Sequence, residues 1–385
     1  MRHLARRVVL ALAALLVALL AAAATPLAAP LLAQGTPAPP PPPERPKLDK
    51  RADPNDWEPY FDHGVQQLNL HRPSEAEKAF WWSSQINPER AEPIFGRWVA
   101  FWMSDYKRWS MYLDDDPRVL RRPDVIAADS LPRRALERNP FVHQGLAVLL
   151  YDQMPGSWRA DVLTRAWLEY AQARFAPAVR DLDRALRDNP KSHVWIRTTR
   201  AQAFVALGQY DSTAAELHAL DAEMTVRADR ELGGYQSKEM LHYALGVLAA
   251  ARGRTAEART ELGTALTENL GFAPAHDLLA QVAFARGDTA AAVTESEQAA
   301  QLSPDDAVLQ YRYGVTLLRV DRAADAIVPL RRATALRPWF AAPFYELGIA
   351  LDESGDKAGA RTALARFAEL APRSDSVRIA AARRY

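Results

Sequence analysis

The sequence contains no cysteine, and its eight histidines are scattered. The lack of cysteine excludes disulfides, thiolate nucleophiles, Cys-ligated zinc, attached c-type haem and a lipoprotein anchor. The sequence also lacks the motifs of nucleophile-elbow hydrolases, P-loop nucleotide-binding proteins, HExxH metalloproteases and dinucleotide-binding domains. We therefore expect no catalytic residue, no metal site and no cofactor in this protein.

Glycine is scarce, with 17 among 385 residues, whereas alanine, leucine, arginine and glutamate fill most segments. These abundant residues lose little side-chain freedom in a helix, so the composition favours an all-α protein. The formal net charge is only +1. Because nucleic-acid binding requires a concentrated basic face, no nucleic-acid partner is expected.

The N-terminus has the pattern of an export signal. Residues 1–7 are basic, and Val8 to Ala24 form an apolar run that is followed by small residues. We assign residues 1–33 to a secretory signal peptide that is cleaved after Ala24 or Ala33. The alternative is that the run stays as an inner-membrane anchor, the only case in which membrane contact is expected. In either case we expect the protein to be exported, to the periplasm or the cell exterior.

Residues 34–56 form a proline-rich linker after this segment. Five consecutive prolines precede Glu44. Such a stretch favours the extended polyproline II conformation, because proline removes backbone donors and fixes the backbone. We expect this linker to be a spacer between the N-terminal segment and the folded part.

A period of 34 residues runs through the C-terminal part of the chain. Pro304, Pro338 and Pro372 lie 34 residues apart, each at the end of a helix-like run. Three other positions of the unit carry small or turn-forming residues at the same period: Gly246, Ala280, Gly314 and Gly348; Gly253, Gly287, Asp321 and Gly355; Ala258, Ala292, Ala326 and Ala360. Small residues let two helices approach closely, and Gly or Asp ends a helix, so each unit is predicted to be a helical hairpin.

This pattern resembles the tetratricopeptide repeat (TPR), in a bacterial exported type of protein. The first helix of each unit carries a large apolar or aromatic residue followed by a small one, and these pairs are Leu245-Gly246, Leu279-Ala280, Tyr313-Gly314 and Leu347-Gly348. The resemblance implies an all-α fold, a right-handed α-solenoid of stacked antiparallel hairpins. It divides the chain into N-terminal divergent Trp-rich repeats (57–158), middle hairpins (159–236), four regular repeats (239–374) and a C-terminal capping helix (375–385).

The divergent segment departs most from the repeat pattern. We expect helices at 91–103, about 124–138 and 141–151. The acidic stretch from Asp114 to Pro117 predicts a longer loop between the first two of them. The number of repeats between residues 91 and 158 therefore stays open.

The resemblance also implies a binding groove. In this family the first helices of the hairpins line a concave side that binds a peptide or a helix of another protein. The fifth residue of each regular unit and a residue two turns later should face that groove, and they are Tyr243, Asp277, Tyr311 and Tyr345, with Phe284 and Leu318. Tyrosine offers a large contact area and one hydroxyl at little entropic cost, which suits peptide recognition. The alternative is that these side chains pack between neighbouring hairpins.

A second candidate surface is the cluster of large rings between Phe80 and Tyr112. Its tryptophans are Trp81, Trp82, Trp98, Trp102 and Trp109. So many rings do not easily all point inward, so some of them are candidates for an exposed docking patch. Core packing is the competing interpretation.

Together these observations predict a non-catalytic scaffold of the cell envelope that binds a protein or peptide in its groove. Two alternatives remain: a membrane-tethered subunit of a larger envelope complex, and the repeat platform of an enzyme of unrecognised type. The sequence does not identify the partner.

Overall fold

The computed structural model describes residues 41–151, 162–188, 193–223 and 237–385. The expected signal peptide, the first part of the linker and the stretch from Arg230 to Gly234 lie outside the described residues. The chain divides into two units, Met1–Pro43 and Glu44–Tyr385. The described secondary structure of the second unit consists of α-helices and short 3-10 helices.

Most helices pair in consecutive antiparallel hairpins, and from α9 to α20 each hairpin packs against the next. The pairs are α2 (Glu58–Asn69) with α3 (Pro73–Ile86), α9 (Val162–Ala171) with α10 (Phe175–Asp188), α11 (His193–Ala206) with α12 (Tyr210–Glu223), α13 (Lys238–Ala251) with α14 (Thr255–Glu268), α15 (Ala273–Ala285) with α16 (Thr289–Leu302), α17 (Ala307–Arg319) with α18 (Ala323–Leu336), and α19 (Ala341–Glu353) with α20 (Lys357–Leu370). This arrangement confirms the predicted all-α, TPR-like solenoid.

Each hairpin turns at a residue in the left-handed conformation. In the four regular repeats these residues are Gly253, Gly287, Asp321 and Gly355, with φ angles of 70°, 79°, 58° and 88°. The next N–H closes the end of the first helix, as where Arg254 donates to the carbonyl of Ala249 at 2.9 Å. This hydrogen bond satisfies a carbonyl that the helix end would otherwise leave without a partner. The periodic glycine is thus explained by backbone geometry.

The periodic small residue on the first helix is explained by packing. A Cβ atom added to Gly314 would lie 2.5 Å from Cγ of Leu330, and one added to Gly348 would lie 2.6 Å from Cγ of Leu364. Glycine therefore lets the two helices of a hairpin approach until leucine fills the space. In the repeat that has Ala280 at this position, the residue equivalent to the leucine is the smaller Ser296.

The divergent segment contains one hairpin with an insertion in its turn. Helix α4 (Glu92–Met103) packs against α7 (Pro123–Arg138), and α5 (Tyr106–Leu113) and α6 (Pro117–Leu120) lie between them in sequence. The loop expected at Asp114–Pro117 is only the short connection between α5 and α6, where Asp116 caps α6 by accepting from the N–H of Arg118. A 3-10 turn η1 (Gly145–Ala147) and α8 (Val148–Tyr151) follow.

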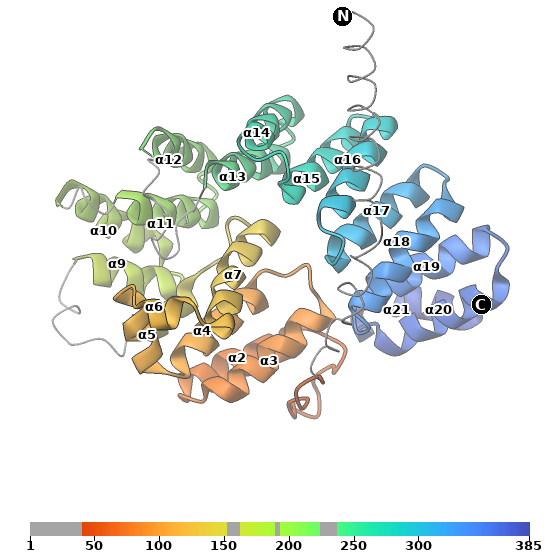
Figure 1. Ribbon diagram of the computed structural model, residues 1–385, viewed down its shortest axis with the longest axis horizontal. Coiled ribbons are helices and arrows are strands. Elements are labelled where there is room, and N and C mark those ends of the chain that lie inside the picture. The colour runs from red at the N-terminus through yellow and green to blue at the C-terminus, as the bar shows by residue number, and fades with distance from the viewer. Residues whose placement is uncertain (1–40, 152–161, 189–192, 224–236) are drawn as a thin grey trace, which may run out of the picture. The chain divides into compact units, whose positions relative to one another are not determined.

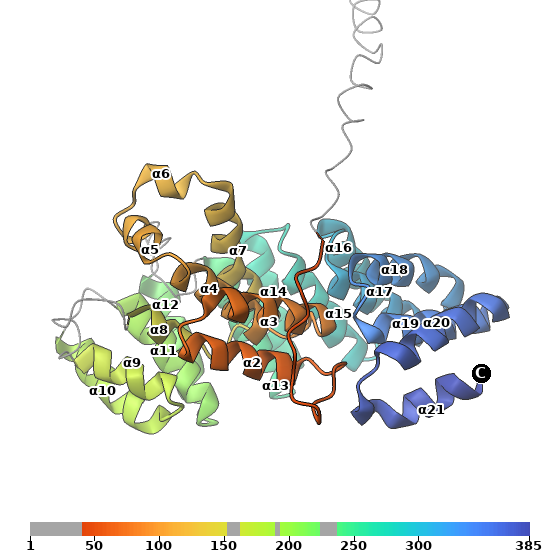
Figure 2. The ribbon, with the colours of Figure 1, turned by 90° about the horizontal axis from the view of Figure 1, so that it is seen from below.

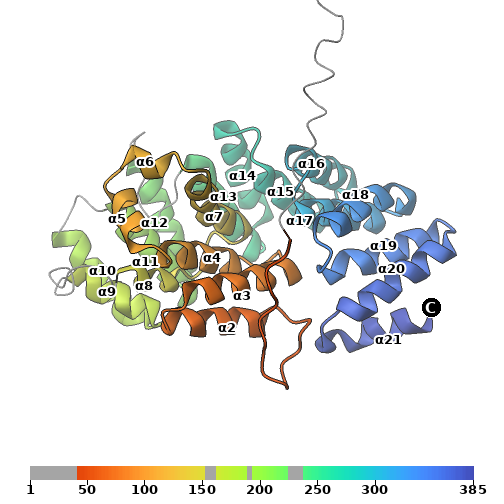
Figure 3. The same cartoon turned by 60° about the horizontal axis from the view of Figure 1, so that its bottom comes forward.

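Within the second unit, the hairpins from α9 to α20 follow one another along an arc, and α2, α3, α4 and α7 lie on its inner side (Figure 1). Figures 2 and 3 show the same relation from two further directions. At the C-terminal end, α21 (Ser376–Arg384) follows the 3-10 turn η3 (Arg373–Asp375) and packs on α20. Over the described part of the chain, no helix has the length and apolar character needed to cross a membrane.

Candidate functional site on the inner surface of the solenoid

The tyrosines of the predicted groove have different surroundings. Tyr243 on α13 is only 7% exposed. Its hydroxyl donates to the backbone carbonyl of Glu137 at 3.0 Å, and its ring meets Phe272 edge-on, with the ring centroids 5.5 Å apart. Because Glu137 belongs to α7, the chain's own N-terminal helices cover this position.

The next two tyrosines are half-buried. The ring of Tyr311 on α17 meets Phe340 edge-on with centroids 5.3 Å apart, the same pairing that Tyr243 makes in its own repeat. Burial raises the pKa of Tyr311 to about 12. The ring of Tyr345 on α19 packs against Phe367 at 4.9 Å, and the Arg378 guanidinium of α21 lies 5.3 Å from the ring centroid. Both side chains keep part of their surface exposed.

One repeat replaces this tyrosine–phenylalanine pair with two acids. The residues equivalent to Tyr243 and Phe272 are Asp277 and Asp306. Asp277 is buried and accepts from the Nη1 of Arg312 at 2.5 Å and from the side-chain amide of Gln281 at 3.0 Å. The nearby Asp277 carboxylate raises the pKa of Arg312 despite its burial.

The second acid binds an arginine from the N-terminal helices. Both carboxylate oxygens of Asp306 accept from the Nη2 of Arg138 on α7, at 2.6 and 2.5 Å. Asp306 also caps α17 by accepting from the N–H of Val308 at 2.9 Å. Burial alone would raise the pKa of Asp306, but Arg138 and the cap outweigh it and lower the pKa.

Two further arginine ion pairs hold the N-terminal helices on the solenoid. Arg312 Nη2 donates to Glu89 at 3.1 Å, so its guanidinium bridges the carboxylates of Glu89 and Asp277. Arg133 on α7 donates to Glu239 on α13 at 3.2 Å. None of these ion pairs joins residues of the same repeat, so they connect segments that are distant in the sequence.

Aromatic rings also connect α3 with the segment that precedes α19. Trp339, which precedes α19, meets Trp81 and Trp82 of α3 edge-on, with centroids 5.7 and 5.0 Å apart. The N-terminal strap, residues 44–57, also reaches the last repeat. Its Asn55 donates to the carbonyl of Glu369 at 2.7 Å. This part of the predicted linker therefore packs on the folded unit.

The predicted tryptophan patch lies mostly in the interior. Trp98, Trp102 and Trp109 are 4%, 0% and 1% exposed, and Trp82 is buried as well. Trp102 and Trp109 pack against each other with centroids 5.2 Å apart. Trp98, Trp102 and Trp109 belong to the core of the N-terminal hairpins, whereas Trp82 packs with Trp81 and Trp339. Their burial agrees with the core-packing interpretation.

Phe284 and Leu318 lie on the inner helices α15 and α17 and are half-buried. The Arg319 guanidinium lies 4.9 Å from the ring centroid of Phe284. Together with Tyr311 and Tyr345 they form the inner aromatic strip, four partly exposed side chains on three successive inner helices. Within the described ranges, no group of three or more histidine and acidic side chains is placed to hold a metal ion.

Sequence reasoning missed the residues that join the N-terminal helices α2 to α7 to the regular repeats. Arg138 and Arg312 carry no motif. A signal was nevertheless present, because Asp277 and Asp306 interrupt positions that are aromatic in the neighbouring repeats. Acids at otherwise apolar, buried positions require cationic partners.

No protein-family model matches the sequence, and no curated protein matches it. Among solved structures, the C-terminal part of a TPR repeat-containing protein from Cytophaga hutchinsonii is 13% identical, with 54% of this chain and 78% of that chain covered and a TM-score of 0.44. YrrB, described as a TPR protein with an unusual peptide-binding site, is 15% identical, with coverages of 53% and 98% and a TM-score of 0.40.

The Cut9–Hcn1 hetero-tetramer of the APC/C contains a chain that is 12% identical, with 85% of this chain and 76% of that chain covered and a TM-score of 0.42. The TPR-like fold of the present chain rests on its own hairpins, their left-handed turns and their glycine–leucine packing, as described above.

Proposed function

We propose that the protein is a non-catalytic scaffold that binds a peptide or helix of a partner protein along the inner aromatic strip. The observation that carries the proposal is the position of Phe284, Tyr311, Leu318 and Tyr345 on successive inner helices, each with part of its side chain exposed. Large rings that are held in place and partly exposed supply contact area at a low entropic cost. Tyr243 has no such role, because α7 covers it.

The test compares capture of partners in the native host. A strip variant carries Phe284→Ala, Tyr311→Ala and Tyr345→Ala. A matched control carries Leu270→Ala and Val328→Ala, which remove two apolar side chains that are 77% and 73% exposed outside the strip. Both variants should keep the helical circular dichroism signal of the wild type.

Crosslinking followed by affinity purification and mass spectrometry should recover a defined partner with the wild type and the control. The strip variant should lose it. Equal recovery with the strip variant and the control would overturn the proposed binding surface.

We further propose that the protein acts in the cell envelope, outside the cytoplasm. The support is the basic, then apolar, then small-residue pattern of residues 1–33. Mass spectrometry of the exported protein tests this location. A new N-terminus after Ala24 or Ala33 indicates a soluble periplasmic or extracellular scaffold, whereas an intact Met1 in a membrane fraction indicates a tethered subunit.

A further inference from the structure

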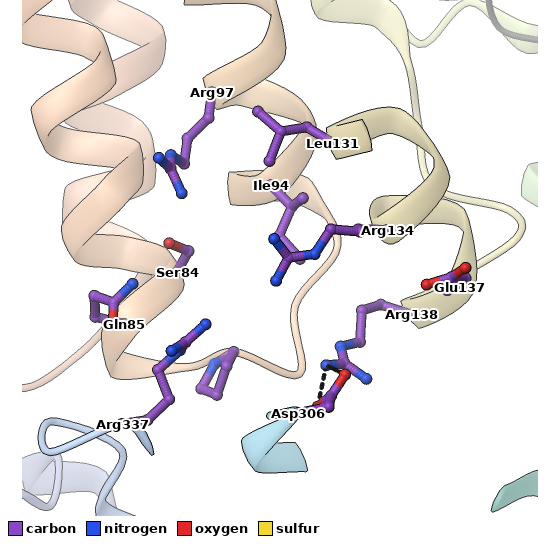
Figure 4. A pocket seen from close by; sticks show the side chains of 11 residues that line it. Ser84, Gln85, Ile94, Arg97, Leu131, Arg134, Glu137, Arg138, Asp306 and Arg337 are labelled. Carbon is purple, nitrogen blue, oxygen red and sulfur yellow. Dashed lines mark hydrogen bonds and ion pairs between the residues drawn. The ribbon is translucent and has the colours of Figure 1, made fainter. Parts of the chain in front are cut away.

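A second feature of the inner surface is a cavity of about 70 Å³ between the N-terminal helices and the regular repeats. Arginines from three segments line it: Arg97 on α4, Arg134 and Arg138 on α7, and Arg337 just after α18. We call it the arginine cavity. Figure 4 shows the guanidinium groups of these residues around one space. The other charged residues that line it are Glu137 and Asp306, on the side of Arg138.

The arginine cavity has more positive charge than its own acids can balance. Counted over the lining alone, four guanidinium groups face two carboxylates. The carboxylates are also engaged elsewhere, since Glu137 accepts from Arg133 at 3.1 Å and Asp306 binds Arg138. Arginine stays protonated at physiological pH, so the excess charge cannot be relieved by losing a proton.

Two of the four arginines form no ion pair with an acid among the described residues. Arg97 pairs with Glu77 at 3.1 Å, and Arg138 pairs with Asp306. The Arg134 guanidinium makes no hydrogen bond or ion pair within the described part of the chain, and the Arg337 guanidinium donates only to the adjacent carbonyl of Leu336 at 2.9 Å. Burial and the neighbouring guanidinium groups lower the pKa of Arg337, and the more distant Asp306 carboxylate offsets this only in part.

The size of the space allows an anion to enter. A single water needs roughly 10–15 Å³ of such volume, so the cavity holds more than one water or a small oxyanion. A second cavity of about 350 Å³, lined by Arg134, Arg138 and Arg337 as well, opens beside it. A ligand with an anionic group in the first cavity therefore has room for a larger body in the second.

We propose that the arginine cavity binds a phosphate group, either as free phosphate or as the phosphomonoester of a larger ligand, with Arg134 and Arg337 as its main contacts. A phosphomonoester carries about −1.5 to −2 charge at neutral pH, which balances the two guanidinium groups of Arg134 and Arg337. It offers acceptor oxygens in several directions, whereas a carboxylate is planar and one arginine fork occupies both of its oxygens. Guanidinium groups that converge from three segments can each reach a different oxygen of a phosphate, but not of a planar carboxylate.

A bound phosphate also joins two parts of the unit. Arg134 belongs to α7, whereas Arg337 lies between α18 and α19. Occupation of the cavity therefore stabilises the N-terminal helices in their position on the repeats. This inference does not depend on the inner aromatic strip, so either proposal can fail without the other.

The test measures binding of inorganic phosphate, phenyl phosphate and acetate to the full chain by isothermal titration calorimetry at constant ionic strength. Thermal unfolding with and without each ion provides a second measurement, because a ligand of the folded state raises the midpoint. The variants are Arg134→Gln and Arg337→Gln. The matched control is Arg331→Gln, which removes an exposed arginine of α18 outside the cavity.

We expect saturable binding of phosphate and none of acetate. Each cavity variant should weaken phosphate binding by about tenfold or more, because it removes charge-assisted hydrogen bonds. Arg134→Lys should bind with intermediate affinity, since it keeps the charge and loses the fork. Binding of phenyl phosphate should strengthen as the pH rises through about 6, where a phosphomonoester loses its second proton, and binding of inorganic phosphate should strengthen at a higher pH.

Tighter binding of phenyl phosphate than of inorganic phosphate identifies a phosphomonoester ligand, and equal or weaker binding identifies free phosphate. The proposal is overturned if neither ion binds saturably. It is equally overturned if acetate binds as well as phosphate, or if the cavity variants bind like Arg331→Gln.

Discussion

The glycine–leucine contact between α17 and α18 leads to a quantitative prediction for Gly314→Ala. The new Cβ would lie 2.5 Å from Cγ and 2.7 Å from Cδ2 of Leu330, whereas unstrained carbon contacts begin near about 3.5 Å. Leu330 is completely buried and cannot move into solvent. Overpacking of this kind costs about 1–3 kcal/mol, against about 1 kcal/mol gained from the higher helix propensity of alanine.

Gly263→Ala is the matched control, because it makes the same chemical change in the middle of α14. Apart from the backbone of its own helix, no heavy atom of the described residues lies within 4 Å of the Cβ that this change adds. This variant should therefore gain about 1 kcal/mol without a steric cost. The difference in stability between the two variants cancels the propensity term and should equal the clash, about 1–3 kcal/mol.

Urea unfolding followed by circular dichroism measures this difference, provided the slope with urea concentration stays the same in both variants. Leu330→Ala should be less harmful in the Gly314→Ala background than alone, because the added methyl fills part of the space that the leucine leaves. If Gly314→Ala proves as stable as Gly263→Ala, close helix approach does not explain the periodic glycine.

Three other predictions concern polar contacts. Tyr243→Phe removes the hydrogen bond to the Glu137 carbonyl and should destabilise the docking of α7 by about 0.5–1.5 kcal/mol, seen as faster hydrogen exchange in residues 123–138. Asp306→Asn keeps a cap for α17 but removes the ion pair with α7. Because the folded-state pKa of Asp306 is lowered, the wild type should lose the stability that this ion pair provides as the pH falls through that pKa. The stability of the variant should not show this loss. The hydrogen bond to Glu295 raises the pKa of His276 above 6.5. The ion pair should therefore stabilise the fold fully below pH 6.5 and lose this contribution as the pH rises through the folded-state pKa. An NMR titration of His276 in the wild type and in Glu295→Gln measures the shift.

The hairpins could be predicted from the sequence because their determinants are local. A glycine or aspartate in the turn, as at Gly253 and Asp321, needs only the backbone conformation of one residue. The small residue on the first helix and the leucine that faces it lie sixteen positions apart, as Gly314 and Leu330 do. The turn residue and the small residue repeat in all four regular units, and the leucine repeats in three of them, so the copies support one another.

The covering of the groove could not be predicted in the same way. Arg138 and Asp306 are 168 positions apart, and their pairing follows no period. A repeat pattern specifies which face of a helix is turned inward, but it does not specify what lies against that face. Tyr243 therefore has the position that the sequence predicts and is buried under α7.

Helix α5 shows another limit of sequence reasoning. Residues 106–113 contain only two helical turns, rich in aromatic residues, which have moderate helix propensity. The short segment forms a helix because Trp109 is buried among other rings and Asp105 caps its start by accepting from the N–H of Arg108. Tertiary packing of this kind is not visible in local propensity.

The strap has a consequence for how this protein can change in evolution. A solenoid usually gains or loses repeats by duplication or deletion, because each repeat contacts only its neighbours. Here Asp53 accepts from the backbone N–H of Arg373 at 2.5 Å, and Asn55 donates to carbonyls at the end of α20, so the first and last segments of the unit hold each other. One additional 34-residue unit between them would separate these partners. The number of repeats is thus tied to the distance that the strap spans, and new variants should arise by substitution within repeats rather than by a change in their number.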